Sequence, residues 1–177
     1  VSLLDVGAAV FEFLERDVIS AVAGVYGLDA KYLSMNDCFL VKYDRDHPGL
    51  ETHVDGSEYS FSLPLNDEFS GGGTFFEYLG SSVRPRVGEA LVHPGDLRHG
   101  GAPVIHGVRY VLVGFLKYKL SCPRARRRRG LELSHSRRRR AVVIASTFTP
   151  STRRRVDGVA MRALTTRCNG HDGVVTG

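Results

Sequence analysis

ETHVDGSEYSFSLPLN, residues 51–66, combines a strand pattern with a histidine and an aspartate just in front of it. In its second half, large apolar residues alternate with small or polar ones: Tyr59, Phe61, Leu63 and Leu65 against Ser60, Ser62, Pro64 and Asn66. Successive side chains of a strand point to opposite faces of a sheet. The alternation therefore predicts a strand with one buried face and one polar face, as in an antiparallel sheet.

Short segments of the same kind lie on both sides of this stretch. They are CFLVKY (38–43), TFFEYL (74–79), VRPRVGEALVHPG (83–95) and HGVRYVLVGFLKY (106–118). Phe39, Val41 and Tyr43 share one face of the first segment. Turns rich in glycine, proline, asparagine and aspartate separate the segments, which is typical of a β-sandwich or barrel.

The beginning of the chain has helical spacing instead. Apolar residues recur there at intervals of three and four, namely Leu3, Val6, Val10, Phe13, Leu14 and Val18. Gly24 and Gly27 follow them. The pattern predicts an amphipathic helix from residue 3 to about residue 23 that packs on the β domain.

The charge divides the chain into two parts. Residues 1–121 contain 10 Lys/Arg and 16 Asp/Glu, whereas residues 122–177 contain 14 and 3. The second part includes the blocks RARRRRG, SHSRRRR and STRRR and few apolar residues at a useful period. We therefore expect a folded domain over residues 1–121 and a disordered, arginine-rich tail over residues 122–177.

Cysteine usage and hydropathy exclude some classes of protein. Cys38, Cys122 and Cys168 lie far apart, which favours neither a disulfide framework nor a thiolate zinc site. No apolar run approaches the roughly 20 residues of a membrane span, and the runs at 110–116 and 141–145 have the length of strands. The chain begins with Val1, and we expect it to be a fragment or a processed product.

His53 and Asp55 are candidate metal ligands. Residues i and i+2 at a strand end point the same way, so both side chains can approach one ion while Val54 faces away. Taken alone, this short motif fits a solvated turn equally well. His99, at a glycine-flanked turn before the last strand, is the best third ligand, and His93 and His106 are weaker ones. Two histidines and one carboxylate suit non-heme Fe(II), and with a bound water they also suit zinc.

Arg109 is the second candidate site residue. It shares a strand face with Val111, Val113 and Phe115, which should point into the core. A buried guanidinium needs a carboxylate, and its planar fork suits a bidentate pair. That carboxylate comes either from a ligand or from the protein itself, with Glu77 and Glu89 as the internal candidates.

Taken together, these motifs resemble a known enzyme family. FLVKYD, HVDGSEYSFSLPLN, FSGGGTFF, VRPRVGEALVHPGDLRHGG and GVRYVLVGF follow the order and spacing of the iron(II)- and 2-oxoglutarate-dependent dioxygenases, in the prolyl 4-hydroxylase and lysyl hydroxylase-like branch. The resemblance extends from about Phe39 to Tyr118. It implies a double-stranded β-helix, or jelly roll, with the metal near one mouth.

The resemblance also implies roles for individual residues. His53, Asp55 and His99 correspond to the iron ligands, and Arg109 to the residue that binds the C5 carboxylate of 2-oxoglutarate. Some relatives have lysine there, so arginine favours the lysyl hydroxylase-like side. Tyr43 corresponds to a position whose hydroxyl often contacts the same carboxylate, although Tyr43 can also be an ordinary core residue.

The implied activity is hydroxylation of a side chain, with peptidyl proline or lysine as the expected substrate. Fe(II), 2-oxoglutarate, O2 and ascorbate are the implied cofactors, and succinate and CO2 the implied products. The alternative is a nucleic-acid-binding protein that uses residues 122–177 together with an inactive or cupin-like barrel. In a third interpretation the tail is a gene-model artefact.

Overall fold

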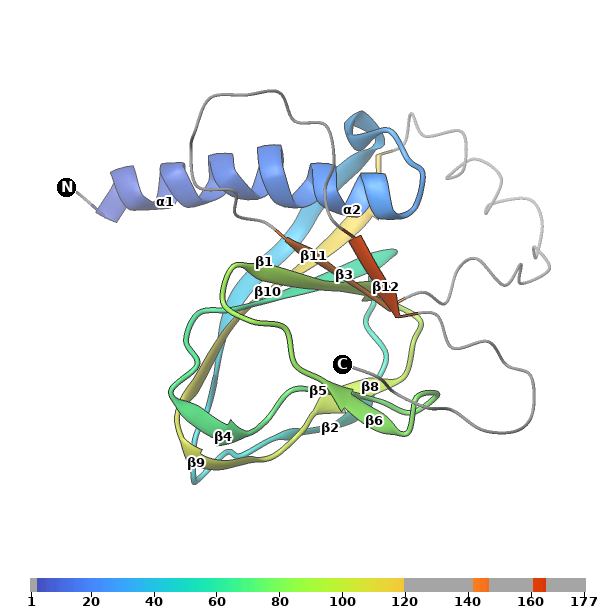
Figure 1. The fold of residues 1–177 in the computed structure, drawn as a ribbon. Coiled ribbons are helices and arrows are strands. Elements are labelled where there is room, and N and C mark those ends of the chain that lie inside the picture. The colour runs from blue at the N-terminus through green and yellow to red at the C-terminus, as the bar shows by residue number, and fades with distance from the viewer. Residues whose placement is uncertain (1–2, 120–141, 147–160, 165–177) are drawn as a thin grey trace.

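Two antiparallel sheets face each other in the computed structural model, which describes residues 3–119, 142–146 and 161–164 (Figure 1). The larger sheet has the order β1-β10-β3-β7-β11-β12. Its strands are β1 (Leu33–Tyr43), β10 (Arg109–Tyr118), β3 (Tyr59–Pro64), β7 (Glu89–Pro94), β11 (Val142–Ser146) and β12 (Met161–Leu164).

The smaller sheet has the order β2-β8-β5-β6, and a separate pair β4-β9 lies beside it (Figure 1). These strands are β2 (Leu50–His53), β8 (His99–Gly101), β5 (Thr74–Phe76), β6 (Ser81–Val83), β4 (Phe69–Gly71) and β9 (Val104–Gly107). From β1 to β10 the chain passes back and forth between the two sheets, which is the winding of a jelly roll. The predicted fold class is confirmed.

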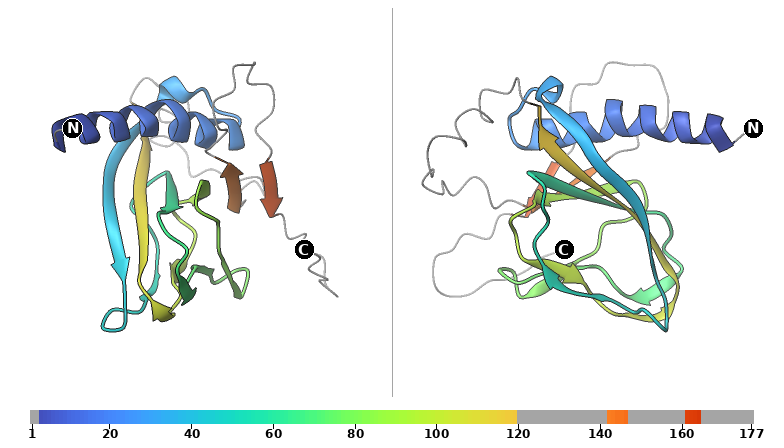
Figure 2. Two further views of the ribbon diagram at one scale, coloured as in Figure 1. Left: turned by 60° about the vertical axis from the view of Figure 1, so that its left-hand side comes forward. Right: turned by 180° about the vertical axis from the view of Figure 1, so that it is seen from behind.

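A helical segment covers the outer face of the larger sheet (Figures 1 and 2). It consists of α1 (Leu3–Phe13), a π-helical turn η1 (Leu14–Val18) and α2 (Ile19–Val25), and a short 3-10 helix η2 (Ala30–Tyr32) leads into β1. The predicted helix is confirmed, and its second half packs on the sheet. Val18 and Val22 are fully buried, whereas Val10 is 41% exposed because α1 extends past the edge of the sheet. None of the helices in the described part of the chain has the length and apolar character needed to cross a bilayer.

The main core fills the space between this helical segment and the sheet. It joins Leu14, Val18, Ile19, Val22 and Ala23 of the helices to Leu33, Tyr59, Phe61, Leu63, Ala90, Val92 and Leu116 of the strands. Within the sheet, Gly114 of β10 pairs with Phe61 of β3, and a Cβ at Gly114 would overlap the Phe61 ring. The apolar face predicted for residues 59–65 therefore lies under the helices.

The polar face of β3 corrects the sequence analysis. All six residues of the strand are buried, and Ser60 and Ser62 are only 1% and 8% exposed. The alternation is present as predicted, but the serine face points between the two sheets and not to solvent. Alternation shows only that the two faces of a strand differ in polarity. The polar face can meet either solvent or a polar interior.

Two short strands lie within the predicted tail. β11 pairs with β7 and with β12, so that Ile144 is opposite Leu91. The apolar run at 141–145, noted in the sequence for its strand-like length, is the signal for β11. The rest of residues 122–177 lies outside the described residues, so the domain boundary at residue 121 and the disorder of that remainder stay predictions.

Candidate metal centre

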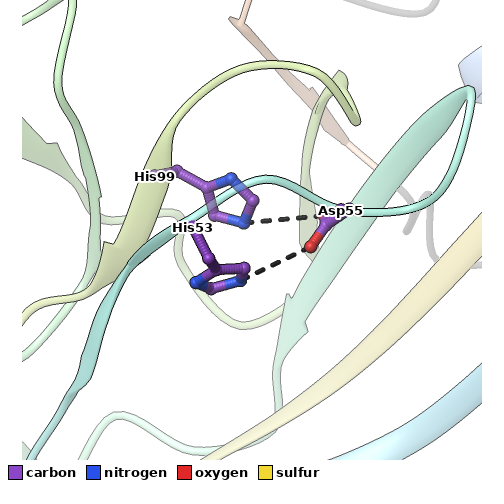
Figure 3. A group of neighbouring side chains, drawn as sticks. All are labelled: His53, Asp55 and His99. Carbon is purple, nitrogen blue, oxygen red and sulfur yellow. Dashed lines mark ion pairs between the residues drawn. The ribbon is translucent and has the colours of Figure 1, made fainter.

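The structure brings His53, Asp55 and His99 together at one end of the space between the sheets. His53 ends β2, His99 begins β8, and the two residues face each other in the register of that strand pair. Their Nε2 atoms lie 3.4 Å and 3.5 Å from the two carboxylate oxygens of Asp55 (Figure 3). The ligand atoms of all three residues lie within 4.8 Å of one another. The arrangement can place two nitrogens and one oxygen on a single ion.

Backbone hydrogen bonds orient both imidazoles. The Nδ1 atom of His53 lies 2.8 Å from the carbonyl of Glu51, and that of His99 lies 2.8 Å from the carbonyl of Leu97. A carbonyl only accepts hydrogen bonds, so each Nδ1 carries a proton, and in a neutral ring the Nε2 lone pair is then left on the side of Asp55. Burial also lowers the pKa of His99, which favours the neutral ring that a metal requires.

Asp55 is held by its neighbours on the turn between β2 and β3. Its side chain is only 4% exposed, its backbone N–H donates to Gly95, and the Ser60 hydroxyl donates to its Oδ2 at 2.5 Å. Ser57 Oγ lies 2.8 Å from Ser60 Oγ and extends this contact. No lysine or arginine of the described residues forms an ion pair with Asp55. A buried carboxylate beside two imidazoles is a suitable site for a cation.

The other two histidines differ in their surroundings. His106 is exposed on β9. His93 is buried, with its ring centroid 4.3 Å from that of His99 and its Nδ1 hydrogen-bonded to its neighbour's carbonyl. Burial, with a smaller contribution from His99, lowers the pKa of His93 to about 4. The sequence analysis considered His93 only as a replacement ligand, whereas it packs behind the His99 ring.

Arg109 lies at the other end of the same space. It is 4% exposed, stands opposite Tyr43 in the β1–β10 register, and has its guanidinium carbon 5.1 Å from the centre of the Tyr43 ring. Burial lowers the pKa of Arg109, with an opposing effect from Tyr43, and burial raises the pKa of Tyr43. Two glycines leave room for these side chains: a Cβ at Gly72 would lie 3.2 Å from the Arg109 side chain, and one at Gly101 would lie 2.7 Å from the Tyr43 hydroxyl.

Arg109 has no carboxylate partner among the described residues. Glu77, one predicted internal partner, pairs with Arg98 at 2.7 Å. Glu89, the other, accepts from the backbone N–H of Arg86 at 2.8 Å. The guanidinium is thus free to bind the carboxylate of a ligand.

A cavity of about 80 Å³ connects the two ends. Its walls include the predicted inward face of β1 and the alternate residues Val111, Val113 and Phe115 of β10. Ser60, Ser62 and Thr74 add hydroxyl groups. The sequence analysis missed these hydroxyls, and for the two serines the available signal was their alternation directly after the His-Val-Asp motif.

Known proteins resemble the β domain of the chain. No protein-family model matches, but procollagen-lysine,2-oxoglutarate 5-dioxygenase 1 of Rattus norvegicus is 41% identical over 85 residues, which cover 44% of this chain and 12% of that protein. Procollagen-lysine,2-oxoglutarate 5-dioxygenase 2 of Homo sapiens is 35% identical over 112 residues, covering 59% of this chain and 15% of that protein. The matched part of this chain is thus similar in sequence to the lysyl hydroxylase-like branch of the 2-oxoglutarate-dependent dioxygenases.

The matches are partial in both directions, since the chain spans only 12–15% of the length of these two relatives. A solved 2OG-Fe(II) oxygenase-family oxidoreductase from Burkholderia pseudomallei is 22% identical, with a TM-score of 0.43 over 48% of this chain and 45% of that one.

Proposed function

We propose that the β domain of this chain is the catalytic domain of an iron(II)- and 2-oxoglutarate-dependent dioxygenase. It hydroxylates a peptidyl side chain, lysine or proline, and releases succinate and CO2. The observation that carries the proposal is the cavity with a two-histidine, one-carboxylate cluster at one end and, at the other, a buried arginine that has no carboxylate partner among the described residues. A ligand that chelates a metal and carries a second carboxylate matches both ends at once.

Each group of residues has a distinct task in this proposal. His53, Asp55 and His99 hold Fe(II) through three ligand atoms and leave the remaining positions open. Arg109, with Tyr43 beside it, binds the C5 carboxylate of 2-oxoglutarate. The bound iron supplies the chemistry of O2 reduction, and ascorbate serves as the reductant that keeps it as Fe(II). The apolar walls contributed by β1 and β10 limit the access of water to the site.

The relatives favour lysine as the substrate side chain, since those cited are named as procollagen-lysine dioxygenases. The loops of the chain give no further indication of the substrate side chain. Of the acidic residues in the described segments, only Asp55 lines the cavity. In the loop after β1, Asp44 pairs with Lys42 at 2.8 Å. An acidic contact to a substrate lysine would have to come from outside the cavity, so proline remains the second candidate.

The test is 2-oxoglutarate turnover by the full chain against matched peptides that contain lysine, proline or asparagine. We expect succinate to form together with a hydroxylated lysine or proline peptide, and to be lost in His53→Ala and His99→Ala. Anaerobic addition of 2-oxoglutarate to the Fe(II)-loaded chain should also produce a visible charge-transfer band. If wild type lacks this band, or if both variants keep it, the proposed function is wrong. Activity with Zn(II) and without Fe(II) would identify zinc as the working ion.

Binding of nucleic acid through the tail is a second candidate, favoured by the 14 Lys/Arg against 3 Asp/Glu in residues 122–177. The test should remove the charge of the tail by substitution, because deletion of the tail would also remove β11, which pairs with β7. Replacement of the arginines at 126–129, 137–140 and 153–155 by glutamine leaves the strand segments intact. Loss of salt-dependent RNA or DNA binding with unchanged succinate formation would separate the two functions. Wild type that does not bind either nucleic acid would exclude this candidate.

A further inference from the structure

The inner faces of β1 and β10 become more exposed from one end of the cavity to the other. On β10, Arg109 is 4% exposed, whereas Phe115 on the same face is only partly buried. On β1, Tyr43 is 8% exposed and Phe39 is 39% exposed. Both phenylalanines line the cavity. The cavity is therefore closed around Arg109 and opens to solvent at the two phenylalanine rings.

The open end of the cavity is the end with the metal cluster. Phe115 stands opposite Ser60 in the β10–β3 register, and the Ser60 hydroxyl donates to Asp55. Phe39 packs edge to face on Phe115, with the ring centroids 5.3 Å apart. The same cavity is lined by His53, whose side chain is 38% exposed. A side chain that enters from solvent therefore meets the two rings and the metal cluster together.

This mouth offers apolar surface and no free carboxylate. Of the acidic residues in the described segments, only Asp55 lines the cavity, and its side chain is 4% exposed. Of the described lysines and arginines, only Arg109 lines the cavity, and it lies at the closed end. Water at an exposed aromatic ring is unfavourable, so an apolar group that replaces this water gains free energy. The mouth is therefore suited to an uncharged aliphatic group.

We propose that Phe39 and Phe115 form the binding surface for the aliphatic carbons of the substrate's target side chain. This inference rests on the proposed function and specifies how its substrate is recognised, which is through the apolar part of the side chain and not through a charge. The methylene chain of lysine and the ring of proline both provide such carbons. A side chain packed on the two rings also closes the mouth and excludes water from the metal cluster.

The test uses a peptide that wild type hydroxylates in the turnover assay, and two versions of it in which the target residue is norleucine or glycine. Norleucine has an apolar side chain without charge, and glycine has no side chain. Fluorescence anisotropy of each labelled peptide gives its dissociation constant, anaerobically with Fe(II) and 2-oxoglutarate, so that no turnover occurs. The variants of the full chain are Phe39→Ala, Phe39→Tyr, which keeps the ring, and the control Leu40→Ala. Leu40 is 57% exposed on the opposite face of β1.

In wild type, we expect the norleucine peptide to bind about tenfold more tightly than the glycine peptide. Phe39→Ala should weaken the binding of the target and norleucine peptides about tenfold and leave the glycine peptide unchanged. Phe39→Tyr should recover most of the affinity, and Leu40→Ala should match wild type. The affinity for 2-oxoglutarate, followed by the charge-transfer band, should be the same in all these variants because Arg109 lies at the closed end.

The inference about the two rings fails if Phe39→Ala binds the target peptide as tightly as wild type does, or if it loses affinity for all the peptides equally. It also fails if wild type binds the norleucine and glycine peptides equally, since a polar or charged group would then recognise the target side chain. A changed oligomeric state of Phe39→Ala in size-exclusion chromatography would assign the rings to a contact between copies of the chain instead. If wild type hydroxylates none of the lysine and proline peptides, the proposed function fails, and the inference fails with it.

Discussion

Replacement of Arg109 by methionine provides the sharpest test of the site. Arg109 is 4% exposed and has no carboxylate partner among the described residues. Methionine keeps much of the length of the side chain and removes the charge. Replacing a buried charged group by an apolar one of similar volume is often neutral or stabilising, by about 1–4 kcal/mol. We therefore expect the free energy of unfolding of the metal-free protein to be unchanged or higher in Arg109→Met.

Binding of 2-oxoglutarate should change in the opposite direction. Loss of one partner of a buried, hydrogen-bonded charge pair costs about 2–5 kcal/mol. This corresponds to a dissociation constant larger by a factor of about 30 to several thousand. The metal ligands lie at the other end of the cavity, so affinity for Fe(II) alone should not change. Arg109→Lys keeps the charge but loses the planar fork, and should fall between wild type and Arg109→Met.

The measurements are urea unfolding of the metal-free protein and anaerobic titration of the Fe(II)-loaded protein, followed by the charge-transfer band. Arg45→Met, at an exposed residue in the loop after β1, removes the same charge far from the cavity wall and controls for net charge. The reasoning is refuted if Arg109→Met loses iron. It is also refuted if the variant is less stable than wild type by more than about 2 kcal/mol while its 2-oxoglutarate affinity stays the same, since the arginine would then be structural.

Three further substitutions test other parts of the structure. Asp55→Ala should abolish the binding of Co(II) in equilibrium dialysis, and retained binding would exclude Asp55 as a ligand. The variant should also lose the stabilisation by metal, which is about 2.7 kcal/mol when the metal concentration is a hundred times the dissociation constant. The pKa of His93 is lowered from 6.5 to about 4. As the pH falls from 6.5 to 4, His93 is therefore protonated in the unfolded chain before it is protonated in the folded one. Over this range the free energy of unfolding of wild type should fall by about 3 kcal/mol more than that of His93→Gln. Equal pH dependence of the two proteins in urea unfolding would contradict this prediction. Gly114→Ala places a Cβ against the Phe61 ring and should lower the free energy of unfolding in urea by about 1–3 kcal/mol. Gly7→Ala, at a position with open space around it, should not lower it. Equal effects of the two substitutions would contradict the packing of β10 against Phe61.

Spacing within single strands predicted much of the site. His53 and Asp55 are two residues apart at a strand end, and Arg109 shares the period of an apolar strand face, so each orientation follows from the alternation of a strand. The meeting of His53 with His99 follows from the β2–β8 register, which involves residues 46 positions apart in sequence. The place of His99 at a glycine-flanked turn before the last strand made it the best third ligand, and the family resemblance pointed to the same residue, whereas periodicity alone could not pair it with His53.

The helix shows a different limit. The apolar period of residues 3–18 predicted a helix correctly, but the apolar residues on that period are not equally buried: Leu14 and Val18 are buried, whereas Val10 is not. Val10 is 41% exposed because burial depends on how far the sheet extends beneath the helix (Figure 2). A sequence pattern gives the direction of a side chain on its own element, whereas burial also depends on the position of the neighbouring elements.

β3 shows why the polar groups of the cavity were assigned to the wrong environment. Its apolar face lies under α2, so the strand is already anchored by Phe61 and Leu63, and its other face is not needed for the core. A jelly roll places that second face inside, where a serine hydroxyl without a hydrogen-bond partner costs free energy. Ser60 has such a partner in Asp55, and Ser62 has none. When a strand carries a polar residue on its buried inner face, an unmet hydrogen bond there marks a place for a ligand or a water, and Ser62 lines the same cavity as the metal cluster and Arg109.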